Sequence, residues 1–525
     1  MAFRIRYATL STETPVARKL KKVLIANRGE IAVRVLRTLR EMSIRSAVIY
    51  SEPDRKSLPV LLADEAYPIG PAPSRESYLR GQAIVDLAKE IGADAIHPGY
   101  GFLSERAEFA RMCRDAGVVF IGPSPEAMDA MGSKVECRRR MIDAGVPVVP
   151  GGRDPLEDAE GAAAFADSIG YPVMIKASAG GGGKGMRRVD SAAEIAAAFR
   201  GASAEALASF GDGSVYIEKY IVDPRHVEIQ VMGDLHGRVV SLGERECSLQ
   251  RRHQKVVEEA PSPVVSPDLR RRMGEAAVRA ASAVGYANAG TCEFLLDADE
   301  NFYFLEMNTR LQVEHPVTEL VTGLDLVYTQ IRVAEGEPLG PEFDDVQPRG
   351  HAIEVRLYAE DPFQKFQPSP GKIHLLRWPE GPGIRNDAGV YEGAEVSIHY
   401  DPMLAKLIVW AENRPRALDR LSRALSELRI EGIRTTAPLF RALLSDADFR
   451  SGNLNIAMLD KKLASGELHA LAVEESGDLP LVAAAIHHFE RAKRAIAVPK
   501  TTGRRTLWRA AGRRDALRPG RHGKG

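Results

Sequence analysis

Short apolar runs alternate with apolar residues at helical spacing through the first part of the chain. Residues 23–26 form such a run, and the apolar residues after the turn at 27–30 recur at helical spacing, which predicts a strand, a turn and a helix. Further strands are predicted over 46–50, 95–96 and 118–121, and further helices over 77–91 and 104–116. This order predicts a layer of parallel strands and helices. The first turn lacks the Gly-x-Gly-x-x-Gly pattern, which disfavours a dinucleotide-binding dehydrogenase.

A second unit follows a segment at 147–154 that is rich in Pro and Gly. Its predicted elements are a helix near 159–169, a strand over 171–177, a helix that follows a glycine run and ends near Ala208, and a strand over 215–220. From Arg225 onward polar and apolar residues alternate, which predicts a large antiparallel sheet with one solvated face. Helices then close the chain, one of them over 415–430 with a proline in its first turn.

A chain of 525 residues is long enough for roughly three domains, and 44% apolar residues are sufficient for a core in each. The predicted fold class combines α/β and α+β: a parallel α/β domain, a small lid domain around the glycine run, and a domain with a large antiparallel sheet. Beyond Lys462 the pattern loosens, although 480–497 fits one amphipathic helix. The predicted divisions are an N-terminal extension (1–19), the α/β domain (20–133), a linker with the lid domain (134–220), the domain of the antiparallel sheet (221–465), and a helix with a basic tail (466–525).

Lys and Arg number 71, as do Asp and Glu, so the formal charge is zero and gives no general reason to bind nucleic acid or a charged membrane. Twelve basic residues lie from Arg491 to the C-terminus, against one acid, Asp515. We therefore expect 500–525 to be a disordered basic tail.

The four cysteines lie far apart and form no disulfide or metal-binding pattern, which favours a reducing compartment, the cytoplasm. No apolar run approaches the roughly eighteen residues that cross a bilayer. Residues 1–22 are basic and rich in Ser and Thr, with a single acid. This composition mildly resembles an organelle presequence, but a solvated N-terminus is the simpler interpretation.

Four consecutive glycines lie between Lys176 and Lys184. Lys176 ends a predicted buried strand, and the glycine amides that follow can turn toward phosphate oxygens. The Walker spacing is absent, because no Gly-Lys-Ser/Thr follows. A flexible linker is the alternative, but the flanking strand and helix favour a mobile phosphate lid.

Two apolar runs flank the turn-rich segment 297–301, which predicts a β-hairpin that brings Glu293 near Glu306. These carboxylates and Asn308 offer the hard oxygen ligands that Mg²⁺ accepts while it bridges nucleotide phosphates. An extended strand would also separate polar from apolar residues. It would place Glu306, Asn308, Arg310, Gln312 and Glu314 on one face and Leu305, Met307, Leu311 and Val313 on the other. We interpret the polar face as the wall of one cavity; a solvated strand face is the alternative.

Two further segments have a structural and a functional interpretation. The charged run 250–259 can contact an anionic substrate or form a solvated surface, and the phosphate loop and metal hairpin favour substrate. Segment 97–105, His-Pro-Gly-Tyr-Gly-Phe-Leu-Ser-Glu, follows a strand at the sheet edge where α/β folds place ligands, but a tight turn explains it equally well. Cys247, beside the charged run, is interpreted as an inert buried thiol.

Five motifs together closely resemble those of the biotin carboxylases, which belong to the ATP-grasp superfamily. They are Asn-Arg-Gly-Glu-Ile at 27–31, the segment 97–105, the glycine run at 176–186, Arg-Arg-His-Gln-Lys-Val-Val-Glu-Glu-Ala-Pro at 251–261, and Glu-Met-Asn-Thr-Arg-Leu-Gln-Val-Glu-His-Pro-Val-Thr-Glu at 306–319. The resemblance covers roughly residues 20–465 in the family's order and spacing. Other ATP-grasp ligases do not share the Arg-Leu-Gln-Val-Glu-His-Pro run.

The resemblance implies a role for each matching residue. The implied ATP-binding residues are Lys134 and Lys176 at the phosphates, Gly181, Gly182 and Gly183 in the lid, Glu218 and His226 at adenine and ribose, and Gln250 and His253 in the wall of the nucleotide site. The implied ligands of Mg²⁺ or Mn²⁺ are Glu293, Glu306 and Asn308. The implied residues of the reaction are Arg310, Gln312 and Val313, which hold bicarbonate, Lys255, which neutralises phosphate or bicarbonate, Glu314, which deprotonates bicarbonate, and Arg356, which stabilises the biotin enolate.

The implied reaction is ATP-dependent carboxylation of biotin through carboxyphosphate, as the first half-reaction of an acetyl-CoA or propionyl-CoA carboxylase. The sequence has no Ala-Met-Lys-Met-like attachment motif, since 403–406 belongs to the carboxylase domain itself. Biotin is therefore expected on a separate biotin carboxyl carrier protein, with a carboxyltransferase subunit as a second partner. The family resemblance also implies a homodimer.

Three alternatives remain. The chain can be the biotin carboxylase subunit of a two-subunit pyruvate carboxylase, which changes the final acceptor but not this site. It can be another ATP-grasp ligase that joins a carboxylate to an amine, which would need neither bicarbonate nor biotin. It can also be a nucleotide-gated assembly subunit, which would not turn over ATP in isolation.

Overall fold

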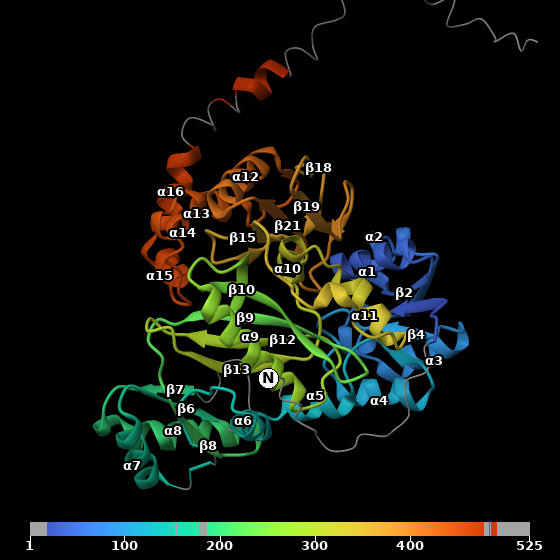
Figure 1. Cartoon of the computed structure of the whole chain (residues 1–525). Helices are drawn as coiled ribbons and strands as arrows, with labels where there is room; N and C mark the ends of the chain where they lie inside the picture. The colour runs from blue at the N-terminus through green and yellow to red at the C-terminus, as the bar shows by residue number, and fades with distance from the viewer. Residues whose placement is uncertain are drawn as a thin grey trace, which may run out of the picture. The chain divides into compact units, whose positions relative to one another are not determined.

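The computed structural model describes residues 18–152, 155–156, 158–177, 186–476, 482 and 485–490 (Figure 1). It contains two compact units, Met1–Ala472 and Val473–Gly525. The glycines at 181–183 and the basic tail lie outside the described residues, as does most of the N-terminal extension. Of the helix predicted over 480–497, residues 482 and 485–490 are described and are helical. Among the described residues, no helix is both long and apolar enough to span a membrane.

The first sheet confirms the predicted parallel α/β layer, with five strands in the order β3-β2-β1-β4-β5. Its strands are β1 (Lys22–Ile25), β2 (Arg45–Ser51), β3 (Glu65–Gly70), β4 (Ala95–His97) and β5 (Val119–Phe120), and its helices are α1 (Gly29–Glu41), α2 (Leu58–Leu62), α3 (Gly81–Glu90) and α4 (Ala107–Asp115). Val23 and Ile25 pack in the core that contains α1, whereas Leu24 packs in the core of α3 and α4. β3 is an edge strand interrupted by Pro68, and its sequence did not predict a strand.

A small antiparallel sheet, with strand order β7-β6-β8, forms the lid unit. Its elements are α7 (Ala159–Ile169), β6 (Val173–Ala177), β7 (Met186–Val189), α8 (Ala192–Phe210) and β8 (Val215–Lys219), and α5 (Pro125–Gly132) and α6 (Lys134–Asp143) precede it. Apolar residues of α7 and α8 pack with those of the sheet in one core. The glycine run thus joins two paired strands, β6 and β7, whereas the sequence predicted a helix directly after it.

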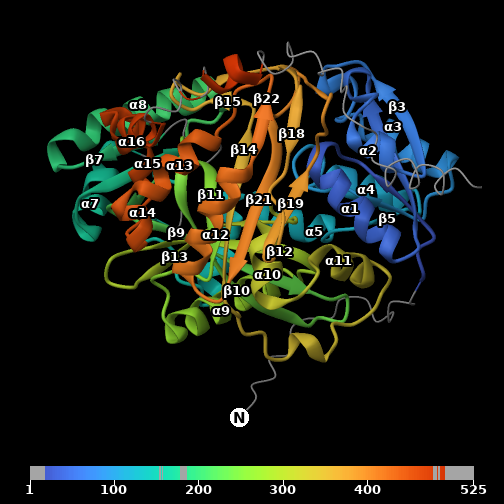
Figure 2. The same ribbon diagram turned by 90° about the horizontal axis from the view of Figure 1, so that it is seen from above.

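The predicted large antiparallel sheet has eight strands in the order β13-β12-β9-β10-β11-β14-β21-β19. The strands are β9 (Arg225–Gly233), β10 (Val239–Arg251), β11 (Gln254–Ala260), β12 (Asn288–Leu296), β13 (Phe302–Asn308), β14 (His351–Tyr358), β19 (Ile384–Ala388) and β21 (Met403–Ala411). The helices around it are α9 (Pro267–Ser282), α10 (His315–Thr322), α11 (Leu326–Ala334) and α12 (Arg414–Glu427). Figure 2 shows α12 beside β21 and β14, and its apolar residues share their core.

The polar face of this sheet is buried, so the prediction of a solvated face is wrong. On β9, Val227 and Ile229 belong to the apolar core that includes α9, whereas His226 and Glu228 alternate with them and are at most 6% exposed. These polar groups remain buried because they bond to charged residues of neighbouring strands, which offsets the cost of removing them from water.

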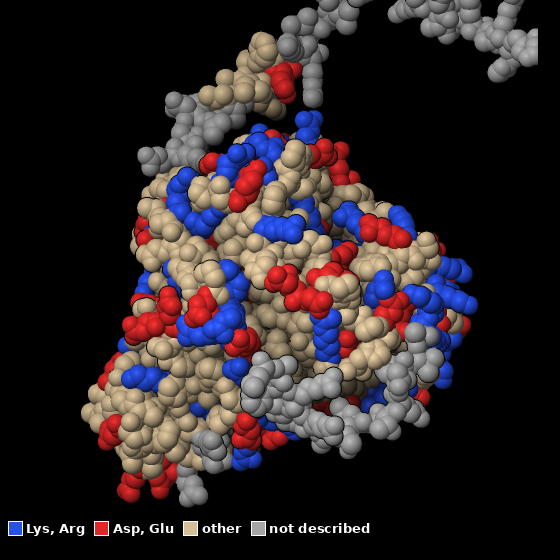
Figure 3. Space-filling view, viewed as in Figure 1, with Lys and Arg blue, Asp and Glu red and all other residues tan. Residues whose placement is uncertain are grey.

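Helices continue past Lys462, where the sequence pattern predicted a looser structure. The last helices of the first unit are α13 (Ala437–Ser445), α14 (Ala447–Ser451), α15 (Met458–Ser465) and α16 (Glu467–Ser476), the last of which crosses the unit boundary. Leu468 is fully buried in the core around α12, which explains why α16 forms. The remaining short strands are β15 (Glu360–Asp361), β16 (Gln367–Pro368), β17 (Gly371–Lys372), β18 (Leu375–Arg377), β20 (Glu395–Val396) and β22 (Arg429–Glu431), and the 3₁₀ turns are Glu52–Asp54, Ser74–Glu76 and Pro341–Phe343. Figure 3 shows acidic and basic side chains interspersed on the face it displays.

Candidate active site

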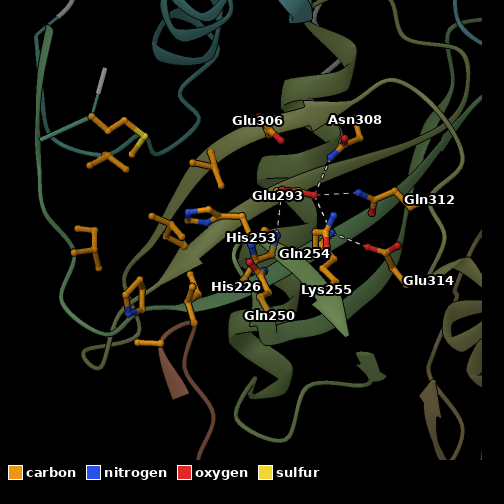
Figure 4. A pocket seen from close by; sticks show the side chains of 18 of the residues that line it. His226, Gln250, His253, Gln254, Lys255, Glu293, Glu306, Asn308, Gln312 and Glu314 are labelled. Carbon is orange, nitrogen blue, oxygen red and sulfur yellow. Dashed lines mark hydrogen bonds and ion pairs between the residues drawn. The ribbon is translucent and has the colours of Figure 1, made fainter. Parts of the chain in front are cut away.

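The β12–β13 hairpin brings together the acidic residues that the sequence singled out. Glu293 lies opposite Glu306 in register, as predicted. Oε1 of Glu293 accepts hydrogen bonds from Asn308 Nδ2 at 2.8 Å and from Gln312 Nε2 at 3.0 Å (Figure 4). The hairpin and the turn after it therefore gather oxygen-bearing side chains at one wall of a pocket.

The chain beyond Asn308 does not stay extended, so the predicted continuous strand over 306–314 is wrong. β13 ends at Asn308, and Glu314 is the N-cap residue of α10. The side chains of Arg310, Gln312 and Glu314 nevertheless line the same pocket. The five polar residues thus converge because a turn carries three of them back toward the hairpin.

Two residues assigned to the apolar face, Leu305 and Val313, also line the pocket. Leu305 is 38% exposed, because a register shift beside Glu293 leaves it without a cross-strand partner and turns it outward. Met307 and Leu311 lie in the core, as predicted.

A cavity of about 810 Å³ is lined by residues of both the lid sheet and the large sheet. Every predicted site residue with a described side chain lines it: Lys176, Glu218, His226, Gln250, His253, Lys255, Glu293, Glu306, Asn308, Arg310, Gln312, Val313, Glu314 and Arg356. Lys134 begins α6, but its side chain lies outside the described residues, as do Gly181, Gly182 and Gly183.

Lys255 is the central cation of the cavity. Its Nζ lies 2.5 Å from Glu228 Oε2, 2.9 Å from Glu293 Oε1 and 2.6 Å from Glu314 Oε1. Burial alone would lower the pKa of Lys255, but the three carboxylates outweigh burial and raise it well above its usual value. Lys255 therefore stays protonated at neutral pH.

Glu314 is a buried carboxylate held between cations. Arg356 donates to Glu314 Oε2 at 3.0 Å from one side, and Lys255 contacts Oε1 from the other. Burial would raise the pKa of Glu314, but the charges of Lys255, Arg356 and Arg245 hold it well below its usual value. Glu314 is therefore ionised at neutral pH and can accept a proton.

The segment 97–105 lies at the edge of this site and reaches it through its last residue. Glu105 accepts a hydrogen bond from Arg310 Nε at 3.0 Å and another from the Thr309 amide at 3.1 Å. Asn27 of the first turn donates to the carbonyls of Pro98 and Tyr100 at 2.7 and 2.8 Å. His97 itself is fully buried, so this segment combines a structural turn with a contact to Arg310.

The lid sheet contributes an ion-pair chain to the cavity. Glu218 accepts from Lys176 Nζ at 2.6 Å and from Arg138 at 2.8 Å. Arg138 escaped the sequence analysis, because nothing in the helical pattern of α6 separates it from its neighbours Arg139 and Arg140. On the opposite side His226 Nε2 lies 3.2 Å from Glu293 Oε2.

Arg245 is a second residue that the sequence analysis missed. It is fully buried on β10, with Nε 2.5 Å from Glu228 Oε1 and Nη2 2.9 Å from Gln312 Oε1. Arg245 lies between Glu244 and Glu246 on a strand, so its side chain points to the opposite face from theirs. This alternation was the only sign in the sequence that could have indicated Arg245. Arg245 thus connects Glu228, which also contacts Lys255, to Gln312 in the turn that leads to Glu314.

The charged run 250–259 divides into residues that line the cavity, residues outside it, and a buried end at 256–259. Gln250, His253 and Lys255 line the cavity, whereas Arg251 packs over the ring of Phe366 with 3.9 Å between Cζ and the ring centroid. Cys247 is fully buried, and burial raises the pKa of its thiol well above the usual value. It is therefore the buried, unreactive thiol that the sequence predicted.

The residues at this wall of the cavity fit a hard divalent cation. Glu293, Glu306 and Asn308 supply carboxylate and amide oxygens, which Mg²⁺ and Mn²⁺ prefer over nitrogen or sulfur. Lys176 of the lid sheet and Lys255 of the large sheet line the same cavity and offer positive charge to a polyphosphate. The fold and this site together define an ATP-dependent ligase of the ATP-grasp class.

Comparison with known proteins narrows the class. Residues 19–128 match the family described as "Biotin carboxylase, N-terminal domain", residues 133–342 the "Carbamoyl-phosphate synthase L chain, ATP binding domain", and residues 354–461 the "Biotin carboxylase C-terminal domain". The chain therefore belongs to the biotin carboxylase family.

Individual relatives support this assignment. The chain is 54% identical over 443 residues to a biotin carboxylase of Halalkalibacterium halodurans, a match that covers 84% of this chain and 98% of that protein. It is 49% identical over 490 residues to the propionyl-CoA carboxylase alpha chain of Ruegeria pomeroyi, covering 90% and 72%. The biotin carboxylase domain dimer of Hydrogenobacter thermophilus 2-oxoglutarate carboxylase, solved with MgADP, ADP and bicarbonate, matches with a TM-score of 0.78 and 48% identity over 84% of this chain and 98% of that one.

Replacing Lys255 with Met should move the acid limb of the pH–activity profile upward by about 1–3 pH units. Without the Lys255 charge, only Arg356 and Arg245 oppose the effect of burial, so the pKa of Glu314 rises and more of this carboxylate is protonated at a given pH. The measurement is kcat/KM for bicarbonate against pH, corrected for the protonation of bicarbonate itself. Lys255→Arg keeps the charge and should leave the limb near its original position; an unmoved limb in Lys255→Met would contradict the argument.

Proposed function

We propose that this chain carboxylates biotin carried on a separate carrier protein, as the first half-reaction of an acetyl-CoA or propionyl-CoA type carboxylase. The observation that carries the proposal is the convergence of a buried anionic base, Glu314, with Lys255 and Arg310 beside the oxygen-rich hairpin. A base next to fixed cations is what bicarbonate needs before it can attack a phosphorus atom.

Arg310, Gln312 and Val313 are the proposed bicarbonate contacts, and Glu314 removes the proton. Lys255 neutralises the anionic charge that then develops. The nucleophilic oxygen of bicarbonate bonds to the γ-phosphorus while the bond from that phosphorus to ADP breaks, which forms carboxyphosphate. The burial of Glu314, and the charges of Lys255, Arg356 and Arg245 that hold its pKa well below the usual value, support this role.

Lys134, Lys176 and the glycines at 181–183 are the proposed phosphate contacts, with Gln250, His253, Glu218 and His226 around the nucleoside. Glu293, Glu306 and Asn308 would hold Mg²⁺ or Mn²⁺, which supplies charge neutralisation at the phosphates when bound. Lid closure over this site would protect carboxyphosphate from water.

Arg356 is the proposed biotin residue. Its Nε donates to Glu258 Oε1 at 2.7 Å and its Nη2 donates to Glu314 Oε2 at 3.0 Å, so the guanidinium is fixed at the cavity wall. Carbon dioxide released from carboxyphosphate would meet the ureido nitrogen of biotin there. This nitrogen loses its proton to the phosphate that carboxyphosphate releases with the carbon dioxide, and then bonds to the carbon of carbon dioxide. The fixed cation stabilises the ureido oxyanion that forms between these two events.

The proposed partners are a biotin carboxyl carrier protein and a carboxyltransferase subunit, and the proposed assembly is a homodimer. The alignment with a propionyl-CoA carboxylase alpha chain, over 90% of this chain, supports an acyl-CoA acceptor. A pyruvate carboxylase uses the same biotin half-reaction, so identifying the biotinylated and CoA-binding chains that co-purify would decide between the two.

The test is ATP cleavage measured with and without bicarbonate and free biotin, together with detection of carboxybiotin. The proposal expects cleavage that requires bicarbonate and carboxybiotin that requires both substrates. Turnover with a carboxylate and an amine in place of bicarbonate would favour the other ATP-grasp ligases. Nucleotide binding without turnover would favour an assembly subunit.

A further inference from the structure

A buried lysine outside the cavity wall holds the turn on which the proposed base lies. Lys406 on β21 is fully buried, and its Nζ donates to the carbonyl oxygen of Val313 at 2.8 Å. Two carboxylates accompany it: Glu30 Oε2 at 3.4 Å and Asp387 Oδ2 at 3.8 Å. None of these three residues lines the cavity of about 810 Å³ described above.

Lys406 has no access to water, because it is fully buried and its strand neighbours Leu404 and Leu407 are at most 1% exposed. A buried ammonium group is costly unless opposite charges and hydrogen-bond acceptors compensate for lost water. The Val313 carbonyl and the two carboxylates provide that compensation.

Glu30 comes from the Asn-Arg-Gly-Glu turn, which the proposed chemistry does not use. Gly29 has φ of +66° at the start of α1, and α1 contacts β19. There a Cβ on Gly389 would lie 2.6 Å from the Glu30 nitrogen, so the two backbones approach as closely as glycine permits. The first domain thereby brings the Glu30 carboxyl group to 3.4 Å from Lys406 Nζ, which itself donates to the Val313 carbonyl.

Two neighbouring cations of one sheet hold this turn. Lys406 lies opposite Arg356 in the β14–β21 register and opposite Asp387 in the β19–β21 register, so the three side chains share a face. Arg356 holds the Glu314 carboxylate, and Lys406 holds the backbone one residue earlier. The Val313–Glu314 peptide is trans and planar, so fixing its carbonyl toward Lys406 also fixes the Glu314 N–H in the opposite direction.

We propose that Lys406, with Glu30 and Asp387 as its counter-charges, is a positioning residue that sets the Val313–Glu314 peptide for bicarbonate. The inference rests on the proposed function and adds to it a role for the first domain in the bicarbonate half of the site. Because Lys406 contacts the turn and not the nucleotide wall, its loss should act on bicarbonate and leave ATP binding unchanged.

The test compares steady-state constants of the full chain and of Lys406→Met. We expect KM for bicarbonate to rise between about tenfold and a hundredfold, as for other displacements of a reacting group by about 1 Å. KM for ATP should change by less than about twofold. The double variant Lys406→Met/Glu30→Gln removes part of the uncompensated charge, so it should regain thermal stability but keep the raised KM for bicarbonate.

Lys462→Met is the matched control, because Lys462 Nζ lies 2.6 Å from Asp446 in a mostly buried ion pair outside the cavity. It should lower stability and leave both KM values unchanged. If the double variant has a normal KM for bicarbonate, Lys406 serves only to balance the buried charges, and the inference is overturned. Equal increases in both KM values would also overturn it. A wild-type chain without bicarbonate-dependent turnover would instead overturn the proposed function, and this inference with it.

Discussion

Glu314→Gln should lower the rate of bicarbonate-dependent ATP cleavage by about 10²–10⁴-fold, the usual contribution of a positioned general base. The amide retains the size of the side chain but cannot take a proton. Lys255 and Arg356 would then face a neutral group, so their charges would still attract the bicarbonate anion. The loss should therefore appear mainly in kcat, measured from phosphate release at saturating ATP and bicarbonate.

Glu300→Gln is the control for this variant, since Glu300 is exposed on the turn of the same hairpin. It should retain wild-type turnover. Full activity in Glu314→Gln, with normal dependence on bicarbonate, would remove Glu314 from the role of base.

Arg245→Met should destabilise the fold by about 3–5 kcal/mol, as when one partner of a buried ion pair is removed. Methionine fills much of the space but removes the ion pair with Glu228, and Gln230, Thr291 and Gln312 lose a donor. The shift of the urea unfolding midpoint, followed by far-UV circular dichroism, measures the loss.

Arg271→Met is the matched surface change, because Arg271 forms exposed ion pairs with Asp268 and Glu275. Pairs of this kind contribute about 0–1 kcal/mol. If both variants unfold at similar urea concentrations, the buried network around Arg245 does not stabilise the sheet as argued.

Much of the fold follows from local pattern. The strand and helix at 22–41 could be predicted because a continuous apolar run gives way, at one turn, to apolar residues at helical spacing. The pairing of Glu293 with Glu306 is readable because a hairpin fixes register over a short distance. β7 could not be recognised, since Met-Arg-Arg-Val has only one buried residue and depends on β6 for its partner.

The site could be predicted from sequence only in part, because its geometry also depends on contacts with other segments of the chain. A period of two gave the correct set of polar residues between 306 and 314, but not the turn that brings them together. Alternation also identified a polar face on β9 without revealing that other strands would cover it with Arg245 and Lys255. Lys406 resembled an ordinary strand lysine, because its partner carbonyl is 93 residues away in sequence.

The turn at 27–30 bears on how such a chain can be divided. Asn27 secures the loop that ends at Glu105, Arg28 lies 4.4 Å from the ring of Tyr400 beside Asp401 of the cavity wall, and Glu30 reaches Lys406. A fragment that began after the first sheet would keep the β12–β13 hairpin but lose these three contacts. A shortened or transplanted version of this enzyme should therefore retain residues 27–30 together with the large antiparallel sheet.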